Sequence, residues 1–282
     1  MDTIMKNLLT LTDLTKKEIS DILEVATQMR RIVATSYKKG PQLIGHVVAG
    51  VWNKPSVSST AFQLATAYLS GTACPVFGAE DVLEQCRTFD SMGVNTMVIG
   101  CDNGNIAKSF ANTSRAGVIN GGSSQYDPIG VLADLMALNS KLDGLSNLNV
   151  LVVGNRDVNK INELNHCLQL FGSNSVWYLP PDDFITTRKG IIIDRAPAAF
   201  SGVDAVIDLG LAAFSEPEKY YGTSGGISED LMDLARVNCP LLGSRYIVDN
   251  VGIKEYAHNI VSTRESCYVS VAMAVLYLLQ RD

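Results

Sequence analysis

Apolar and polar residues follow two different spacings along the chain, and each change of spacing marks a predicted element. Short runs rich in Val, Ile and Leu, bounded by turn-forming residues, recur at 47–52, 71–77, 94–100, 116–122, 150–155, 175–179 and 203–209. Apolar runs of this length are typical of strands that are buried on both faces of a sheet.

Segments with helical spacing separate these runs. Thr15 and Glu18 form a capping-box pattern, after which apolar residues recur every three or four positions up to Met29. The later predicted helices span 58–69, 80–92, 106–112, 126–140, 160–171 and 266–279. Strands that alternate with helices predict an α/β fold with parallel sheets flanked by helices.

The segment after the first long strand carries the strongest functional signal. The strand at 47–52 runs into Lys54-Pro55, and Ser56, Ser58, Ser59 and Thr60 then open a helix. A helix N-terminus presents unpaired backbone N–H groups and the positive end of the helix dipole. These hydroxyl groups therefore have two interpretations: a simple helix cap, or a cradle for an anion or small ligand.

Composition narrows the possible classes of protein. Of the 282 residues, 46% are hydrophobic and 18% are charged, which predicts packed cores rather than disorder. The net charge of −6 argues against a general role in binding nucleic acid or a membrane surface. We find no signal-peptide pattern and no apolar run of the ~18 residues that a membrane span needs.

The six cysteines are dispersed, without a Cys-x-x-Cys pair, which predicts reduced thiols in a cytoplasmic protein. The three histidines, His46, His166 and His258, lack ligand spacing, so we expect no metal site. The glycine at 154 stands alone after a strand and does not make a dinucleotide fingerprint. No cofactor is expected.

The segment 54–60, Lys-Pro-Ser-Val-Ser-Ser-Thr, resembles the Lys-Pro-Ser-Thr-Arg-Thr-Arg loop of aspartate and ornithine carbamoyltransferases. Further similar segments are Asn120-Gly121-Gly122, 201–206 and the closing helix, so the resemblance covers nearly the whole chain. It implies an N-terminal carbamoyl phosphate-binding-like domain (1–138, with the last helix, 266–282) and an amino acid-binding-like domain (139–265). It also implies a place in amino-acid metabolism or pyrimidine biosynthesis.

Several positions differ from the motifs of that family. Ser58 and Thr60 stand where the family has arginines, and Gly100 lies in the segment where it has another. The His-Pro-x-Gln motif aligns with 127–130, so that Asp127 replaces the histidine. A Ser and a Lys that the family lends to a neighbouring subunit have no counterpart in 74–79, and Arg245 lies near the position of the second-domain signature.

Asp127 also has two interpretations, because an aspartate before Pro128 is a common helix N-cap as well as a possible catalytic base. The ligand-binding residues that we predict, if a ligand is bound, are Lys54, Ser56, Val57, Ser58, Ser59, Asp127 and Arg245. No catalytic residue is assigned.

Two hypotheses follow from these residues. In the first, the chain is a non-catalytic structural or regulatory subunit, or pseudoenzyme, that assembles as the homotrimer implied by the resemblance or with an active carbamoyltransferase or other pathway enzyme. In the second, it is a transferase that binds a less charged substrate or an amino acid in the cleft between its domains. Neither hypothesis involves nucleic acid or a membrane.

Overall fold

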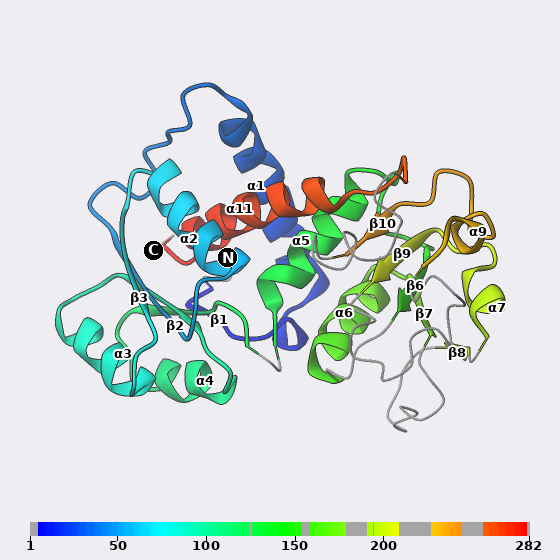
Figure 1. Cartoon of the computed structure of the whole chain (residues 1–282). Helices are drawn as coiled ribbons and strands as arrows, with labels where there is room; N and C mark the ends of the chain where they lie inside the picture. The colour runs from blue at the N-terminus through cyan, green and yellow to red at the C-terminus, as the bar shows by residue number, and fades with distance from the viewer. Residues whose placement is uncertain are drawn as a thin grey trace. The chain divides into compact units, whose positions relative to one another are not determined.

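The computed structural model describes residues 5–123, 126–153, 158–178, 191–193, 195–208, 227–243 and 256–280, with backbone alone at 158–161, 176–178 and 191–193 (Figure 1). The chain forms two compact units. The first comprises Met1–Met136, Val158–Glu163 and Glu265–Asp282, and the second comprises Ala137–Asp157 and Leu164–Arg264. Each unit is described by itself.

The first unit is built on a sheet with the strand order β1-β5-β4-β2-β3, in which all neighbours are parallel. Its strands are β1 (Asn7–Leu8), β2 (Val47–Trp52), β3 (Thr72–Phe77), β4 (Thr96–Gly100) and β5 (Gly117–Asn120). The helices are η1 (Leu11–Asp13), α1 (Lys16–Ala34), α2 (Val57–Tyr68), α3 (Val82–Ser91), α4 (Asn105–Ala111) and α5 (Pro128–Asn139).

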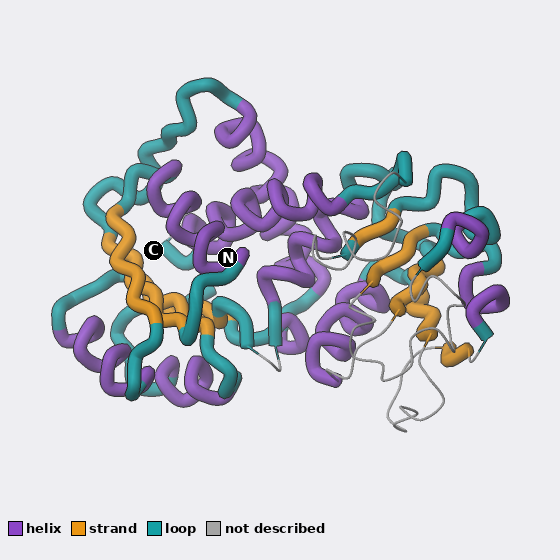
Figure 2. Tube along the Cα trace, viewed as in Figure 1, coloured by secondary structure: helices purple, strands orange, loops and turns teal. Residues whose placement is uncertain are grey.

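The second unit is built on a sheet with the order β10-β9-β6-β7-β8, again with parallel neighbours. Its strands are β6 (Asn149–Val153), β7 (Asn174–Tyr178), β8 (Ile191–Ile193), β9 (Ala205–Asp208) and β10 (Leu241–Leu242). The helices α7 (Ala196–Phe200) and α9 (Glu229–Met232) belong to this unit, whereas α6 (Val158–Leu170) and α11 (Val261–Leu278) each have residues in both units. The strands are drawn in orange in Figure 2; they form two sheets, and the predicted α/β fold with parallel sheets is confirmed.

Capping residues fix where two of the helices begin, and a proline fits the position of an edge strand. The predicted capping box of α1 is confirmed, since Thr15 N donates to Glu18 Oε2 at 2.8 Å and Glu18 N donates to Thr15 Oγ1 at 3.3 Å. Asp81 caps α3 by a single bond, in which its Oδ1 accepts the N–H of Glu84 at 3.0 Å. Pro75, which cannot donate to a strand ladder, lies in β3 at the edge of the sheet.

The two faces of the first sheet carry different side chains. Ala49, Val51 and Ile99 point toward α3 and α4, where they pack with Phe110 and Cys86. The alternate positions, among them Gly50 and Trp52, face α2, whose Phe62 lies against them. Figure 1 shows α3 and α4 on one side of this sheet, and α2 and α11 on the other.

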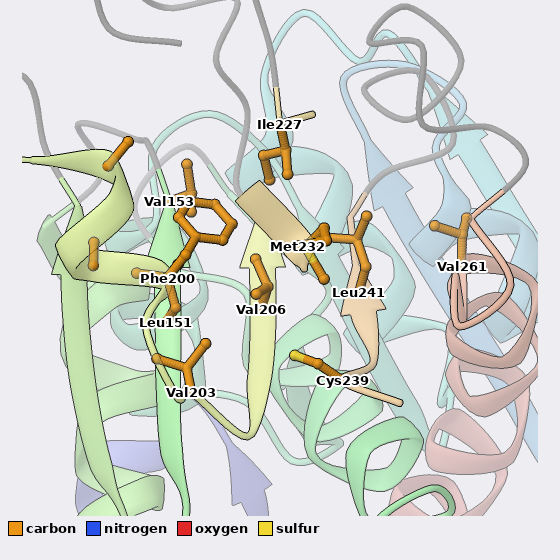
Figure 3. Close-up of a cluster of buried hydrophobic side chains, with 12 residues drawn as sticks. Leu151, Val153, Phe200, Val203, Val206, Ile227, Met232, Cys239, Leu241 and Val261 are labelled. Atoms are coloured by element: carbon orange, nitrogen blue, oxygen red, sulfur yellow. The ribbon is translucent and has the colours of Figure 1, made fainter. Parts of the chain in front are cut away.

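The core of the second unit gathers residues from both the sheet and its short helices (Figure 3). Phe200 of α7 is fully buried against Leu151 and Val153 of β6. Met232 of α9 and Leu241 of β10 belong to the same buried cluster. Contacts between segments so distant in sequence explain how elements as short as α9 and β10 persist.

Several boundaries differ from those predicted. Helix α11 begins at Val261 rather than near 266, because Asn259 Oδ1 accepts the N–H of Val261 at 3.0 Å and the polar run 262–265 continues the helix. The strands β1, β8 and β10 and the helices α7 and α9 were not predicted, since none is long enough to show a period. The glycine at 154 and Arg245 lie outside the described residues.

Candidate functional site

The N-terminus of α2 is closed by a reciprocal capping box. Ser59 N donates to Ser56 Oγ at 3.1 Å, and Ser56 N donates to Ser59 Oγ at 2.8 Å. The Ser59 hydroxyl also donates to the Ser56 carbonyl oxygen at 2.9 Å. Ser59 is fully buried and its hydroxyl is therefore engaged in the fold, which supports the cap interpretation over the cradle.

Ser58 connects this helix to the end of β5. Its hydroxyl donates to the Gly121 carbonyl oxygen at 2.5 Å, and the side chain is only 7% exposed. A hydroxyl group has one proton to donate, so this bond occupies it. Around it, Lys54, Ser56 and Val57 lie on the surface, and Val57 is 52% exposed.

A strip without side chains crosses the sheet beside Ser58. Gly50 in β2 and Gly100 in β4 lie on neighbouring strands, and Gly121 follows β5 and extends its ladder through a bond to Ile99 O at 2.8 Å. The indole of Trp52 fills this strip. A Cβ added at Gly50 would lie 1.8 Å from Trp52 Cζ3, and one added at Gly100 would lie 2.1 Å from Trp52 Cδ1.

Trp52 is itself almost fully enclosed. It is 4% exposed and stacks on Phe77 with ring centroids 6.0 Å apart. Its indole nitrogen has no hydrogen-bond partner among the described residues, although a buried donor without an acceptor is costly. The ring instead packs on Gly50, Gly100 and Gly121.

Asp127 caps the next helix in the site. Its Oδ1 accepts the N–H of Gly130 at 3.0 Å, and its Oδ2 accepts the hydroxyl of Tyr268 in α11 at 3.1 Å. A Cβ at Gly130 would lie 2.1 Å from Asp127 Oδ2, so glycine is required for this approach. The contacts of Asp127 match its N-cap interpretation.

Behind Asp127 lies a buried carboxyl group, that of Glu163 in α6. Glu163 is 0% exposed; its Oε1 accepts the N–H of Leu11 at 2.9 Å and its Oε2 accepts the N–H of Asp127 at 3.1 Å. Burial raises the pKa of the Glu163 carboxyl to about 7, although the bonds from Leu11, Thr10 and Asp127 favour the charged form.

Two open pockets border the same region. One, of about 440 Å³, lies between α2 and α11 and is lined by Val57, Leu64, Val269 and the hydroxyl residues Ser56 and Thr60, among others. The other, of about 380 Å³, lies beyond the carboxyl ends of β2, β3 and β4.

The second pocket has both polar and apolar residues on its wall. Asn53 and Asp102 line it, and Asn53 Nδ2 donates to Asp102 Oδ2 at 2.8 Å. Within the described part of the chain, no cluster of His, Cys, Asp and Glu could hold a metal ion.

The structure thus brings together only part of the predicted site. Ser58 contacts Gly121, and a Cβ at the adjacent Gly122 would lie 3.5 Å from Asp127 Oδ1, so the α2 and α5 termini meet at this glycine pair. The sequence reasoning missed Trp52, Glu163 and Tyr268. The alternation of Gly50 and Trp52 could have indicated the first, whereas nothing local indicated the other two.

These features define a class: a protein of two α/β units with parallel sheets, whose candidate site lies at the carboxyl edge of the first sheet, beside a capped helix N-terminus. Among the described residues, we find no helix that is both long and apolar enough to cross a membrane.

Comparison with known proteins shows which family this class of fold corresponds to. The family model for the aspartate/ornithine carbamoyltransferase carbamoyl-P binding domain matches residues 6–140. The aspartate carbamoyltransferase catalytic subunit of Carboxydothermus hydrogenoformans is 31% identical over 158 residues, which is 53% of this chain and 51% of that relative. The alignment thus spans about half of the relative's length.

A second catalytic subunit, from Caldicellulosiruptor bescii, is 22% identical over 98% of each chain. The crystal structure of ornithine carbamoyltransferase from Thermus thermophilus superposes with a TM-score of 0.82, 21% identity and coverage of 99% of this chain and 100% of that one. At this identity the superposition shows the fold alone. The chain belongs to the aspartate/ornithine carbamoyltransferase family.

Proposed function

We propose that this chain is a non-catalytic member of the family, which serves as a structural or regulatory subunit and does not transfer carbamoyl groups from carbamoyl phosphate. The single observation that carries the proposal is the packing of the Trp52 indole on Gly100 and Gly121. Gly100 lies in the segment where the resemblance expects an arginine, and the ring fills the space that a side chain there would need.

The charges around α2 support the same proposal. Carbamoyl phosphate is a dianion, and each charge-assisted bond from an arginine is worth roughly 1.5–3 kcal/mol. The hydroxyl of Ser58, at the position of the central arginine, donates to Gly121 O, and the carboxylate of Asp127 lies beside Gly122. Together these replacements remove attraction and add repulsion.

Calorimetry tests this proposal. Titration of carbamoyl phosphate into the full chain is expected to give no saturable heat up to millimolar concentration, and aspartate or ornithine should release no phosphate. The Carboxydothermus hydrogenoformans catalytic subunit is the positive control under the same conditions. Saturable binding by this chain, with phosphate release when the amino acid is added, would overturn the proposal.

We further propose that the chain assembles as a homotrimer or with an active carbamoyltransferase, in the cytoplasm. The relatives are named as catalytic subunits, which supports assembly with other chains. All six cysteines are described and none forms a disulfide, which supports a reducing compartment. The proposal also includes the domain limits 1–138 with 266–282, and 139–265. Light scattering coupled to size-exclusion chromatography tests it; a monomer at all concentrations, with and without an active relative, would contradict it.

A transferase for a less charged substrate is the second candidate. The open pocket beside α2 favours it, because Ser56 and Thr60 offer hydroxyl groups there next to apolar Val57 and Leu64. Thermal-shift screening against amino acids and carbamoyl compounds tests this candidate. A shift that persists unchanged in Ser56→Ala would place the ligand elsewhere.

A further inference from the structure

Glu163 joins three segments that are far apart in sequence. Its two carboxyl oxygens accept one backbone N–H each, from Leu11 beside η1 and from Asp127 at the start of α5. The partners lie 152 and 36 residues away along the chain. One buried carboxyl group therefore fixes the beginning of the chain, the start of α5 and the first turns of α6 to one another, all within the first unit.

The ionised form of Glu163 fits this arrangement best. A carboxylate accepts on both oxygens, whereas a carboxylic acid must direct its proton along one of them. The N–H groups of Leu11 and Asp127 each donate to one carboxyl oxygen, and a proton turns one of these oxygens into a hydroxyl group, which is a weaker acceptor. Protonation is therefore expected to weaken one of the two bonds.

The groups around Glu163 favour a change between its ionised and protonated forms near neutral pH. Burial raises the pKa of Glu163 to about 7, and the like charge of Asp127 acts in the same direction. Asp127 in turn accepts from Tyr268 of α11, while Thr10 beside η1 favours the ionised form. His166 lies three residues later in the same helix, α6.

We propose that Glu163 is a proton-operated joint, which binds the N–H groups of both Leu11 and Asp127 when ionised and holds one of them less tightly when it takes up a proton. Because Asp127 caps α5 and lies beside Gly122, a weaker bond to Asp127 N loosens the helix start that borders the candidate site. The joint is a property of the first unit alone and does not depend on the proposed function.

Asp90 provides an internal comparison. It also accepts from several donors: Ser114 Oγ at 2.8 Å, Arg115 N at 3.1 Å and Ala116 N at 3.2 Å. Burial opposes its ionisation, but these bonds prevail and lower the pKa of Asp90. Its amide partners should therefore keep their bonds throughout the range in which those of Glu163 change.

A nuclear magnetic resonance titration of the full chain from pH 5 to 9 tests the joint. At least one of the Leu11 and Asp127 amide protons, together with the Glu163 carboxyl carbon, is expected to titrate with a shared midpoint near 7. The amide protons of Arg115 and Ala116 should stay constant over the same range. Flat amide shifts at Leu11 and Asp127, or a Glu163 midpoint below pH 5, would overturn the proposal.

Two variants assign the titration. Glu163→Gln should abolish it, and His166→Gln should leave it in place. A titration that survives in Glu163→Gln, or that is lost in His166→Gln, would assign the proton to another group and refute the joint. The wild-type carboxyl titration decides the question by itself if a variant does not fold.

Stability gives an independent readout. A carboxyl group with a raised pKa holds its proton more tightly when folded, so its ionisation costs stability as pH rises from the ordinary value toward 7. The free energy of unfolding of Glu163→Gln, relative to wild type, should therefore increase between pH 5 and pH 8. A difference that stays constant over this range would contradict a titrating Glu163.

Discussion

The two faces of the first sheet differ sharply at its carboxyl edge. On the face toward α2, Trp52 covers Gly50, Gly100 and Gly121, and the hydroxyls of Ser58 and Ser59 are bonded within the fold. On the face toward α3 and α4, a pocket of about 380 Å³ stays open, with the exposed side chains of Asn53 and Asp102 on its wall.

This difference shows that a strand end near a helix N-terminus does not by itself make a ligand site. The carboxyl ends of parallel strands usually border a binding crevice. Here Trp52 fills the space over the glycines, and the hydroxyls of Ser58 and Ser59 are bonded within the fold, so the open space beside the serine loop lies away from the strand ends, between α2 and α11. Substitutions on the two faces should therefore have very different effects on stability.

The largest effect is expected from Trp52→Ala. Removing a buried aromatic ring and leaving its cavity costs about 3–5 kcal/mol, and Trp52 is 4% exposed over three glycines that offer no atoms to fill the gap. Urea unfolding followed by circular dichroism measures the loss. Trp52→Phe is the matched control and should cost less than half as much; a loss below about 1 kcal/mol for Trp52→Ala would refute tight filling of the strip.

Gly100→Ala should have the next largest effect. The added Cβ would lie 2.1 Å from Trp52 Cδ1 and 2.3 Å from Trp52 Nε1, so the ring must move. Such overpacking costs typically about 1–3 kcal/mol. The same unfolding experiment in the Trp52→Ala background should show Gly100→Ala to be nearly neutral, and equal costs in both backgrounds would mean that the ring does not cover Gly100.

A smaller loss is expected from Ser56→Ala. This change removes the side-chain acceptor for Ser59 N at the start of α2, and loss of such a cap typically costs about 1 kcal/mol. Ser56→Asp keeps an acceptor at the same place and should retain most of the stability. If both variants unfold at the same urea concentration as wild type, the capping box does not stabilise α2.

The smallest effect belongs to the open face. Asn53→Ala removes one bond between exposed side chains, to Asp102 Oδ2, and should change the free energy of unfolding by less than about 0.5 kcal/mol. The midpoint of urea unfolding measures it. A cost as large as that of Gly100→Ala would show that the Asn53–Asp102 bond stabilises the fold. The two faces of the sheet would then not differ in their contribution to stability.

Much of the fold could be predicted because its strands are buried on both faces. The run Val47–Trp52 is apolar throughout, and five of its six residues are buried. The alternation of such runs with helices then required parallel neighbours. Short elements such as β10 and α9 could not be predicted, since contacts with Phe200 and Leu151 from elsewhere in the chain stabilise them.

The candidate site was predicted less completely. The sequence located the start of α2 within one residue and indicated that Ser56 and Asp127 could be caps, because capping depends on neighbours three positions away. It did not indicate that Ser58 bonds to Gly121, since these residues are 63 positions apart. Arg245 lies outside the described residues.

The sequence by itself determined the α/β fold, the parallel sheets and the caps, because periodicity and capping act over a few residues. Only the tertiary structure decided that Trp52 fills the glycine strip, and that Glu163 joins Leu11 to Asp127. Those contacts form between distant segments once the chain has packed, and burial then sets both the space available to a ligand and the charge of a carboxyl group.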